Sequence, residues 1–248
     1  MKKIAVYGKG GIGKSTITGA LSAAAADMGL RVMQIGCDPK ADSCMNLLGG
    51  KPITPVMDLL REGRTRLTLE DVVAEGYRGV LCVEAGGPTP GLGCAGRGIL
   101  TTFDLLEDLG AFDHYAPDVV FFDVLGDVVC GGFAAPIREG YAQEVVIVNS
   151  GEKMALFAAG NICSAVEQFA DREYAKVKGL ILNRRNVRRE EELVRDFAAA
   201  HQVPILGDIP RDDLFQQCED LCQTVIEGAP DSEPARRLRA VARLCVEG

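Results

Sequence analysis

The stretch GKGGIGKST, residues 8–16, restricts the possible folds of this chain more than any other feature. It follows a short apolar run at Ile4–Tyr7 and precedes a long alanine-rich segment with helical character. The stretch matches G-x-x-x-x-G-K-[ST] in the strand–loop–helix context that this motif requires. Its glycines allow successive backbone N–H groups to surround phosphates, and the N-terminus of the following helix adds its dipole. The sequence therefore predicts a P-loop NTPase fold.

The residues of this loop have separate expected roles. Lys14 is expected to reach the β and γ phosphates of the nucleotide, and Ser15 is expected to ligate Mg²⁺. Lys9, early in the loop, is either a further functional residue or a solvated loop side chain, and the pattern alone does not decide between these. The predicted nucleotide-binding residues of the loop are Gly8, Lys9, Gly10, Gly11, Ile12, Gly13, Lys14, Ser15 and Thr16.

Short apolar runs alternate with helical patterns along the whole chain. Strands of nearly continuous Val, Ile and Phe, separated by helices, indicate an α/β fold with a mostly parallel sheet covered by helices on both faces. We find no linker, internal repeat or low-complexity segment, so we expect a single domain over residues 1–248. The predicted strands are Ile4–Tyr7, Val32–Ile35, Val80–Val83, Val119–Phe122, Val145–Val148, Val177–Leu182 and Val203–Gly207. The predicted helices are Ser15–Met28, Pro55–Arg61, Ile99–Leu109, Lys153–Phe169, Arg189–Ala200 and Glu233–Val246.

The composition restricts the cellular setting and the partners. The net charge is −8, the pI is near 4.9, and no lysine- or arginine-rich block stands out, which argues against nucleic acid as the main partner. Nine cysteines in 248 residues are too few for a secreted disulfide scaffold, so we expect reduced thiols, some of them ligands. The N-terminus does not resemble a signal peptide and no segment reaches membrane-spanning length. A cytoplasmic protein without a membrane partner is therefore predicted.

Two further segments carry carboxylates that suit a nucleotide site. The run VVFFD at residues 119–123 is a predicted buried strand that ends in Asp123, a position suited to orienting Mg²⁺ or its waters. It continues to Gly126 as a D-x-x-G switch, whose glycine N–H can sense a γ-phosphate. Asp38 and Asp42, in GCDPKADS, follow a predicted strand end, where ligands bind in open α/β sheets. Taken singly, either aspartate is also consistent with a helix N-cap or a turn.

Two cysteines lie in glycine-rich loops. Cys94 occurs in GLGCAGRG, residues 91–98, and Cys130 occurs in GDVVCGGFA, four residues past Gly126. Glycine-rich backbone next to cysteine is typical of an iron–sulfur cluster, because backbone N–H groups can then donate to its sulfides. A cubane needs four thiolates, so two ligands per chain suggest a cluster shared by two chains across a symmetry axis. Zinc is the alternative and is less favoured, because zinc sites usually show paired spacings within one chain.

Six other cysteines have structural interpretations. Cys218 and Cys222 have an i, i+4 spacing that also suits two ligands, but we favour packing residues on a short helix. The remaining four lie in or beside predicted core elements, where buried free cysteine is common. These four are Cys37, Cys44, Cys82 and Cys163.

The chain resembles the iron protein (dinitrogenase reductase) of nitrogenase and its close relatives over nearly its whole length. The segments that match that family in order and spacing are GKGGIGKST, GCDPKADS, GGPTPGLGCAGRG, FFDVLGDVVCGGFAAPIRE and IPRD. The run around Cys130 is especially specific, because ordinary P-loop ATPases carry no cysteine there. The resemblance implies a homodimer that holds one [4Fe-4S] cluster through Cys94 and Cys130 of both chains. Each chain is then expected to bind MgATP or MgADP, and to couple ATP hydrolysis to passing one electron to a nitrogenase-like catalytic complex.

The resemblance also implies roles for individual side chains. Lys9 is expected to reach across the dimer to the partner's nucleotide, and Arg97, three residues past Cys94, is expected to meet the catalytic complex. Ferredoxin or flavodoxin is the implied electron source. The carboxylates expected around Mg²⁺ and the attacking water are Asp38, Asp42, Asp123 and Asp127. The residues assigned to catalysis are Lys9, Asp38 and Asp127. The expected adenine-side residues are Asn183, Pro210 and Asp212.

Departures from that family's pattern leave the final substrate open. The sequence ends at Gly248, whereas nitrogenase iron proteins usually carry a further C-terminal extension with subunit contacts. Lys153 stands where a methionine is usual, and Cys44-Met45 replaces the usual Thr-Arg. Arg97 places the chain nearer nitrogenase than the branch that reduces chlorophyll precursors. The reductase of a nitrogenase-like system acting on a nickel tetrapyrrole or on methylthio-alkanes fits equally.

Two other function classes share the P-loop fold. A positioning or partition ATPase moves cargo, and its membrane-bound form uses an amphipathic C-terminal helix. The Glu233–Val246 segment has an apolar face, but its apolar residues are small, so we expect it to pack back on the sheet. An iron–sulfur carrier ATPase places its cysteines near the C-terminus in a tight pair. The position of Cys130 argues against both classes.

Overall fold

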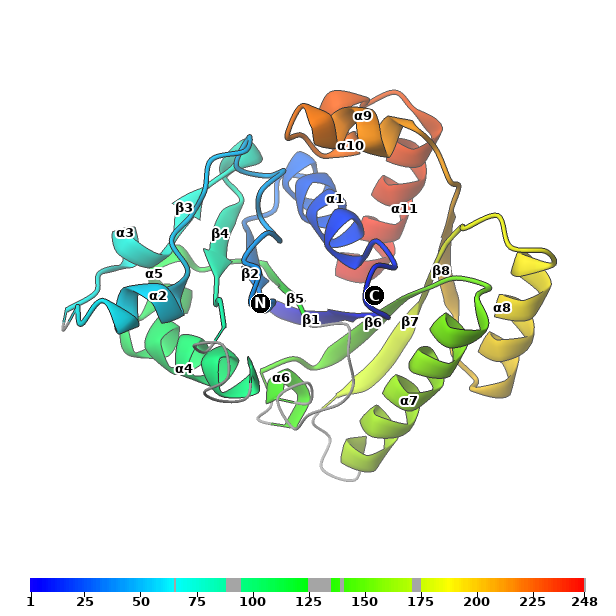
Figure 1. Ribbon diagram of the computed structural model, residues 1–248, viewed down its shortest axis with the longest axis horizontal. Helices are drawn as coiled ribbons and strands as arrows, with labels where there is room; N and C mark the ends of the chain where they lie inside the picture. Colours follow the sequence, from blue (N-terminus) through cyan, green and yellow to red (C-terminus); the bar gives the residue numbers. More distant parts are fainter. Residues whose placement is uncertain (65, 88–94, 125–134, 139–140, 171–174, 248) are drawn as a thin grey trace.

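The centre of the structure is a mostly parallel sheet with the N-terminal strand near its middle (Figure 1). The computed structural model describes residues 1–64, 66–87, 95–124, 135–138, 141–170 and 175–247. Within these residues the sheet has eight strands in the order β3-β4-β2-β5-β1-β6-β7-β8, and only the short β3 runs antiparallel to its neighbour. The strands are β1 (Lys2–Tyr7), β2 (Val32–Gly36), β3 (Ala74–Glu75), β4 (Leu81–Glu84), β5 (Val119–Asp123), β6 (Glu144–Asn149), β7 (Lys176–Asn183) and β8 (Ile205–Ile209).

Helices cover both faces of this sheet (Figure 1). The longer helices are α1 (Lys14–Asp27), α4 (Ala95–Asp108), α7 (Lys153–Ala170), α8 (Glu190–Ala200) and α11 (Glu233–Glu247). The shorter helices are α2 (Val56–Arg61), α3 (Leu69–Val72), α5 (Ala111–Tyr115), α6 (Ala135–Arg138), α9 (Leu214–Asp220) and α10 (Val225–Gly228), with a 3₁₀ turn at Tyr77–Gly79. One core cluster joins α1, α9, α10 and α11 to one face, and a second joins α2, α4, α5 and α7 to the other.

The two cores follow from the alternation of side chains along each strand. In β1, Ile4 and Val6 pack on the side of α1 and α11, whereas Ala5 and Tyr7 pack on the opposite side. Both sets are fully buried, which explains why the strands read as nearly continuous apolar runs. The small residues of Ala23–Ala25 are also fully buried, and they allow α1 to pack closely against its neighbours.

The predicted strands and long helices are all present, so the predicted α/β class is confirmed. The largest shift is in α4, which begins at Ala95 rather than at Ile99. The elements that the sequence did not predict have five residues or fewer, which is too short for a periodic pattern to register. These elements are β3, α3, α5, α6, α10 and the 3₁₀ turn. The single-domain assignment stays a prediction.

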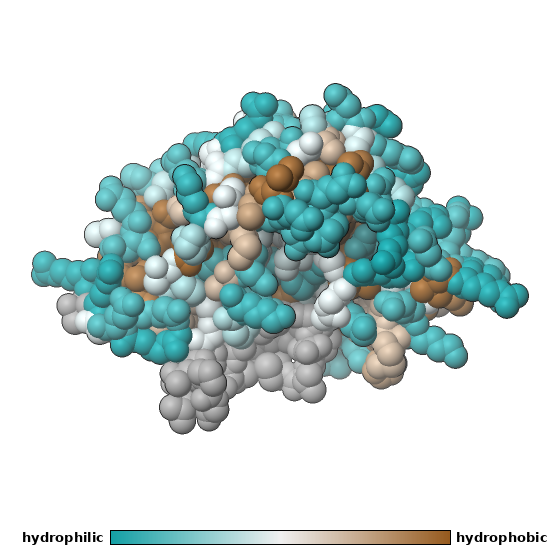
Figure 2. All heavy atoms as spheres, turned by 45° about the horizontal axis from the view of Figure 1, so that its top comes forward, coloured by the Kyte–Doolittle hydropathy of each residue, from teal (hydrophilic) through white to brown (hydrophobic). Residues whose placement is uncertain are grey.

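The C-terminal helix packs on the body of the protein, as predicted. Its apolar face is at most 1% exposed and lies against α1 and β8. The face turned forward in Figure 2 is mostly hydrophilic, with scattered hydrophobic side chains. No helix among the described residues has the length and apolar character to span a bilayer. The residues of the buried face are Leu238, Val241, Ala242 and Cys245.

One local prediction is wrong in part. The short helix expected to carry both Cys218 and Cys222 ends at Asp220, so it holds only the first of these cysteines. Cys218 is buried as expected, at 4% exposure. Cys222 follows the helix with a left-handed backbone, φ 54°, and is only partly buried. A residue with positive φ cannot continue a right-handed helix, which places Cys222 off the packed face.

Candidate nucleotide-binding site

The P-loop connects the end of β1 to the start of α1. Gly13, the residue before α1, has a left-handed backbone with φ 91°, and a Cβ there would lie 2.6 Å from Nδ2 of Asn183. Glycine is therefore required at this position. Among the described residues, no side chain caps the first turn of α1 and no acidic residue lies in it. The N–H groups of this turn, with the positive end of the helix dipole, suit a phosphate group.

Lys14 and Asp123 form a buried ion pair next to this loop. The Lys14 Nζ atom lies 2.5 Å from Oδ1 of Asp123, and the two side chains are 8% and 0% exposed. The second oxygen of Asp123 accepts a hydrogen bond of 2.6 Å from the hydroxyl of Ser43. The strand end that was predicted to supply a carboxylate to the site therefore lies against the P-loop lysine.

A row of buried polar side chains continues behind Asp123. Gln34, in the middle of β2, donates through Nε2 to the Ser43 hydroxyl at 2.9 Å and to the Ser43 carbonyl at 3.0 Å. Its Oε1 accepts a hydrogen bond of 2.8 Å from the hydroxyl of Ser22 on α1. These bonds satisfy the buried amide and fix the segment after β2 relative to α1 and β5.

The segment after β2 and the P-loop line a pocket of about 720 Å³. Asp38 and Asp42 both line it, and Lys9 lines it from the P-loop side. Oδ1 of Asp38 also accepts the N–H of Lys40 at 3.0 Å, which is the turn interaction considered as its alternative role. The sequence-predicted residues that line this pocket are Lys9, Gly10, Gly11, Gly13, Lys14, Ser15, Thr16, Asp38 and Asp42.

A second, smaller pocket of about 240 Å³ lies on the other side of Gly13 and Thr16. Nδ2 of Asn183 donates to the carbonyl of Ile12 at 2.8 Å, so the loop after β7 is held against the P-loop. Oδ1 of Asp212 accepts a backbone N–H at the start of α9 at 2.9 Å. The residues expected on the adenine side all line this pocket: Asn183, Pro210 and Asp212.

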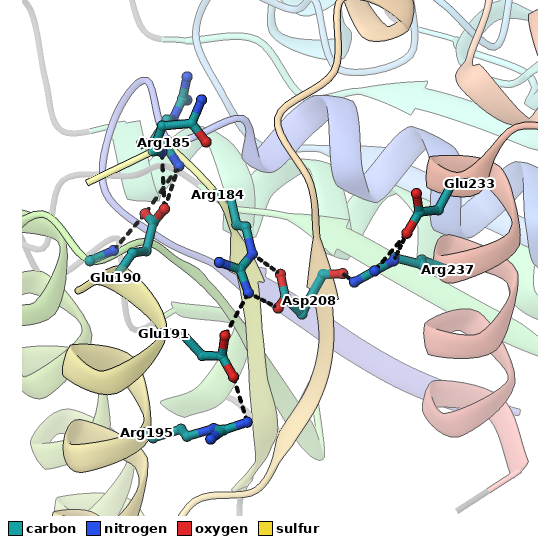
Figure 3. A network of polar contacts seen from close by, with 10 residues as sticks. Arg184, Arg185, Glu190, Glu191, Arg195, Asp208, Glu233 and Arg237 are labelled. Atoms are coloured by element: carbon teal, nitrogen blue, oxygen red, sulfur yellow. Dashed lines mark hydrogen bonds and ion pairs between the residues drawn. The ribbon is translucent and has the colours of Figure 1, made fainter. Parts of the chain in front are cut away.

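Sequence reasoning missed two residues that hold this second pocket. Nη2 of Arg185 donates to the carbonyl of Gly11 at 2.6 Å, so a guanidinium group supports the P-loop from outside. The Glu190 carboxylate, 4% exposed, accepts backbone N–H groups of Gly151, Arg185 and Asn186 at 3.0–3.1 Å. It thereby ties together the loops that follow β6 and β7, and the Arg185–Glu190 contact is drawn in Figure 3.

An ionic network borders this pocket (Figure 3). The Arg184 guanidinium contacts the Asp208 carboxylate and, at 3.1 Å, Glu191. Arg237 of α11 donates to the backbone carbonyl of Asp208 at 2.7 Å and pairs with Glu233. The network therefore joins β7, β8, α8 and α11.

A shallow depression of about 600 Å³ lies beside this network. It is lined by charges of both signs that pair with one another, so it does not resemble a phosphate site.

Most of the cysteines that the structure describes are buried. Seven of the nine cysteines lie in the described residues, all with free thiols, and all but Cys222 are buried, as expected for Cys37, Cys44, Cys82, Cys163 and Cys218. Burial raises the pKa of the Cys37, Cys44 and Cys245 thiols, which favours their uncharged form. Within the described ranges, no group of three or more cysteine, histidine or acidic side chains is arranged to hold a metal.

The two cysteines that remain are the predicted ligands. Cys94 and Cys130 lie outside the described residues, as do the switch residues Gly126 and Asp127. Arg97 lies in the first turn of α4, which begins one residue after Cys94. The assignment of Cys94 and Cys130 as cluster ligands therefore stays a prediction.

The buried residues behind the site had only a weak signal in the sequence. Gln34 interrupts an otherwise apolar strand, and Glu84 ends another. A polar residue inside a buried strand needs a partner, which is a reason to look for one. The partners, however, come from distant segments. Ser43 is the last residue of the GCDPKADS motif, but nothing in that motif indicates its bond to Asp123.

Solved structures with this fold include nucleotide-dependent ATPases. The cell division ATPase MinD of Pyrococcus furiosus has a TM-score of 0.76 at 19% identity, covering 99% of this chain and 98% of that one. The septum site-determining protein MinD of Pyrococcus horikoshii OT3, complexed with Mg-ADP, has a TM-score of 0.75 at 19% identity, covering 98% and 94%. At these identities the likeness concerns the fold alone. It confirms the P-loop NTPase class.

Sequence relatives are much closer than these structures. A nitrogenase iron protein from Methanospirillum hungatei JF-1 is 56% identical over 245 residues, which cover 98% of this chain and 86% of that protein. The family model described as 4Fe-4S iron sulfur cluster binding proteins, NifH/frxC family, matches residues 2–248. The chain therefore belongs to the NifH/frxC family of 4Fe-4S iron–sulfur cluster-binding proteins.

Proposed function

We propose that the protein is the ATP-dependent electron donor of a nitrogenase or nitrogenase-like system. Two copies hold one [4Fe-4S] cluster through Cys94 and Cys130 of each chain. Each copy binds MgATP at its P-loop, and hydrolysis to MgADP and phosphate accompanies the passage of one electron to a separate catalytic complex. When bound, the cluster supplies a single low-potential electron. Ferredoxin or flavodoxin reloads it, and the protein works in the cytoplasm.

The observation that carries this proposal is the position of Asp123. Its carboxylate pairs with the P-loop lysine, Lys14, and its chain continues within seven residues to Cys130. A change at the phosphates is thus joined to a cluster ligand by one short stretch of backbone. Proteins usually sense a γ-phosphate through the ordering or movement of such a switch segment.

The chain's own groups suit the phosphate chemistry. Lys14 provides a buried cation for the β and γ phosphates, and Ser15 provides a hydroxyl for Mg²⁺. Asp38 and Asp42 line the same pocket and, with Asp127, are the proposed carboxylates around Mg²⁺ and the attacking water. Lys9 is proposed to contact the nucleotide of the second copy. Asn183, Pro210 and Asp212 are proposed to receive the adenine side.

The buried face of α11 does not favour a positioning ATPase. The membrane-bound form of such proteins needs an accessible amphipathic helix, and here Leu238 and Val241 are packed against the body of the protein. The two MinD structures described above are each 19% identical to this chain. At that identity their likeness supports a shared fold and not a shared function.

The test is metal analysis of the anaerobically purified protein. We expect four irons and four sulfides per dimer, and an EPR signal after reduction with dithionite. Cys94→Ser and Cys130→Ser should each abolish cluster binding while leaving a folded chain. The control is Cys222→Ser, because this thiol is partly buried and lies in neither glycine-rich loop, so its cluster content should equal that of the wild type. Stoichiometric zinc without an EPR signal would contradict the proposal.

A further inference from the structure

Glu84 is a buried carboxyl group that no known role of the site explains. It is the last residue of β4 and is 1% exposed. Oε1 accepts the backbone N–H of Cys44 at 2.7 Å. Oε2 is buried and has no hydrogen-bond partner among the residues that the structure describes. An acidic side chain with one unpaired oxygen is costly to bury, so the position of Glu84 needs an explanation.

The backbone around Glu84 leaves space for this carboxyl group. Gly36 pairs with Glu84 in the register of β2 and β4. A Cβ on Gly36 would lie 2.0 Å from Oε2 of Glu84 and 2.7 Å from Cβ of Ser43. The carboxyl group therefore occupies the volume that a side chain at position 36 would need.

Glu84 is connected to the nucleotide site through two adjacent residues. It holds the N–H of Cys44, and the preceding residue, Ser43, donates its hydroxyl to Oδ2 of Asp123 at 2.6 Å. The other oxygen of Asp123 contacts Lys14. A short chain of contacts thus runs from β4, across the segment after β2, to the P-loop lysine.

The surroundings of Glu84 favour its uncharged form. The pKa of its carboxyl group is raised to about 7: burial is the main cause, the Cys44 hydrogen bond acts in the opposite direction, and the Asp123 and Asp42 carboxylates add to the rise. An uncharged carboxyl group can keep accepting the Cys44 N–H without adding a third negative charge beside Asp123 and Asp42. Glutamine has the same acceptor oxygen and the same lack of charge.

We propose that Glu84 is a positioning residue of the nucleotide site, which holds the Asp38–Met45 segment against β4 so that Ser43 keeps Asp123 oriented toward Lys14. Glu84 does not touch the nucleotide. It acts on Asp123, and through Asp123 on Mg²⁺-bound nucleotide. The inference rests on the nucleotide-binding part of the proposed function and on no property of the cluster or the catalytic partner.

The test compares nucleotide affinity with and without Mg²⁺ in Glu84→Ala and Glu84→Gln. The probe is a fluorescent ADP analogue, titrated into the purified dimer in excess Mg²⁺ or in EDTA. Glu84→Ala leaves the Cys44 N–H buried without an acceptor, so we expect Mg²⁺-dependent affinity to fall by about tenfold, the effect of one such contact. Affinity in EDTA should change by less than about threefold, because the phosphate contacts of the P-loop remain. Glu84→Gln should return the Mg²⁺-dependent affinity to near the wild-type value.

Two further variants make the test specific. Glu144→Gln is the matched control, because Glu144 is a largely buried strand carboxylate at the opposite end of the sheet, paired with Lys178, and should bind the probe as the wild type does. Ser43→Ala removes the next link and should reproduce the Mg²⁺-selective loss, even if Glu84→Ala does not fold. Its effect and that of Glu84→Ala should be non-additive.

Three results would overturn the inference. These are wild-type affinity in both Glu84→Ala and Ser43→Ala, equal losses with and without Mg²⁺, and failure of Glu84→Gln to restore binding. The fate of the proposed function is separate. A wild-type dimer that binds Mg²⁺-nucleotide but carries no cluster would contradict the electron-donor proposal and leave the role of Glu84 intact.

Discussion

The Lys14 ammonium lies 2.5 Å from Oδ1 of Asp123, and both side chains are almost completely withdrawn from solvent. Removing one member of such a pair leaves the other charge buried without its partner, which usually destabilises a fold by about 3–5 kcal/mol. The same lysine is the cation proposed for the β and γ phosphates. We therefore expect both stability and nucleotide binding to depend on the side chain of Lys14.

Lys14→Ala should lose both properties. We expect nucleotide affinity to fall below detection, and the free energy of unfolding to decrease by about 3 kcal/mol, because Asp123 keeps only its Ser43 hydrogen bond. Urea denaturation and titration with a fluorescent ADP analogue measure the two effects. Lys51→Ala is the control, since Lys51 is exposed and lies outside the site. A Lys14→Ala protein with unchanged stability would show that the pair contributes nothing net.

Lys9→Ala should have a different signature. Lys9 lines the same pocket but is partly exposed, and its proposed target is the nucleotide of the second copy. The variant should keep its cluster and much of its ATP affinity, and lose hydrolysis. Phosphate release measured beside nucleotide affinity checks this. Equal affinity and equal turnover in the wild type and the variant would reduce Lys9 to a solvated loop residue.

The sequence made the fold and the P-loop predictable because their signals are local. Three adjacent segments of the chain carry the P-loop signal: β1, the glycines of residues 8–16 and the helix after them. Each later strand is recognisable by its own short apolar run. Even the boundary of α7 at Lys153 was predicted correctly. Each of these features has a signal that lies within one continuous stretch of sequence.

The polar layer behind the site could not be predicted, because tertiary packing creates it. Glu84 meets Cys44 across 40 positions of sequence, and Asp123 meets Ser43 across 80. No local pattern predicts which buried carboxyl group receives which backbone N–H. The same holds for Arg185, which follows β7 and contacts Gly11 after β1, although β6 lies between these two strands.

The stability of the nucleotide-free protein should depend on Glu84 as pH rises. The pKa of this carboxyl group is raised from 4.5 to about 7 in the fold, mainly by burial, so the native state keeps a proton that the unfolded chain releases. The free energy of unfolding should therefore fall between about pH 4.5 and pH 7, by about 3 kcal/mol from this group, and level off above pH 7. Glu84→Gln should remove this slope. Urea midpoints from pH 5 to pH 8 provide the comparison, and identical slopes in both proteins would contradict it.

Gly36→Ala should be severely destabilising. The added methyl group would lie 2.0 Å from Oε2 of Glu84 and 2.7 Å from Cβ of Ser43, in a fully buried region. Overpacking of this kind costs about 1–3 kcal/mol or more, and here it also displaces the residue that holds Asp123. The control is Gly160→Ala in α7, where the nearest atoms lie 3.8 Å away and alanine should be neutral or stabilising by up to about 1 kcal/mol. Equal melting temperatures for the two variants would contradict the prediction.

The catalytic partner should bind in a nucleotide-dependent way. Electron transfer requires the cluster to come close to an acceptor, so the docking face must surround Cys94 and Cys130. Arg97 lies in the first turn of α4, which begins one residue after Cys94, and we propose that it belongs to this face. Because Asp123 leads through Gly126 to Cys130, a γ-phosphate at Gly126 should bias the face toward one geometry.

We therefore expect the dimer to retain a nitrogenase-like complex from native extract only with ATP or an MgADP–metal fluoride mimic, and not with MgADP or without nucleotide. Arg97→Glu should abolish retention while sparing cluster content and nucleotide affinity, because the proposed role of Arg97 is to contribute charge to the contact surface. A pull-down in each nucleotide state, read by mass spectrometry, measures both expectations. Retention that is independent of nucleotide, or retention of membrane or DNA alone, would contradict the electron-donor role. The retained protein would also identify the final substrate, because the reduction takes place on that partner.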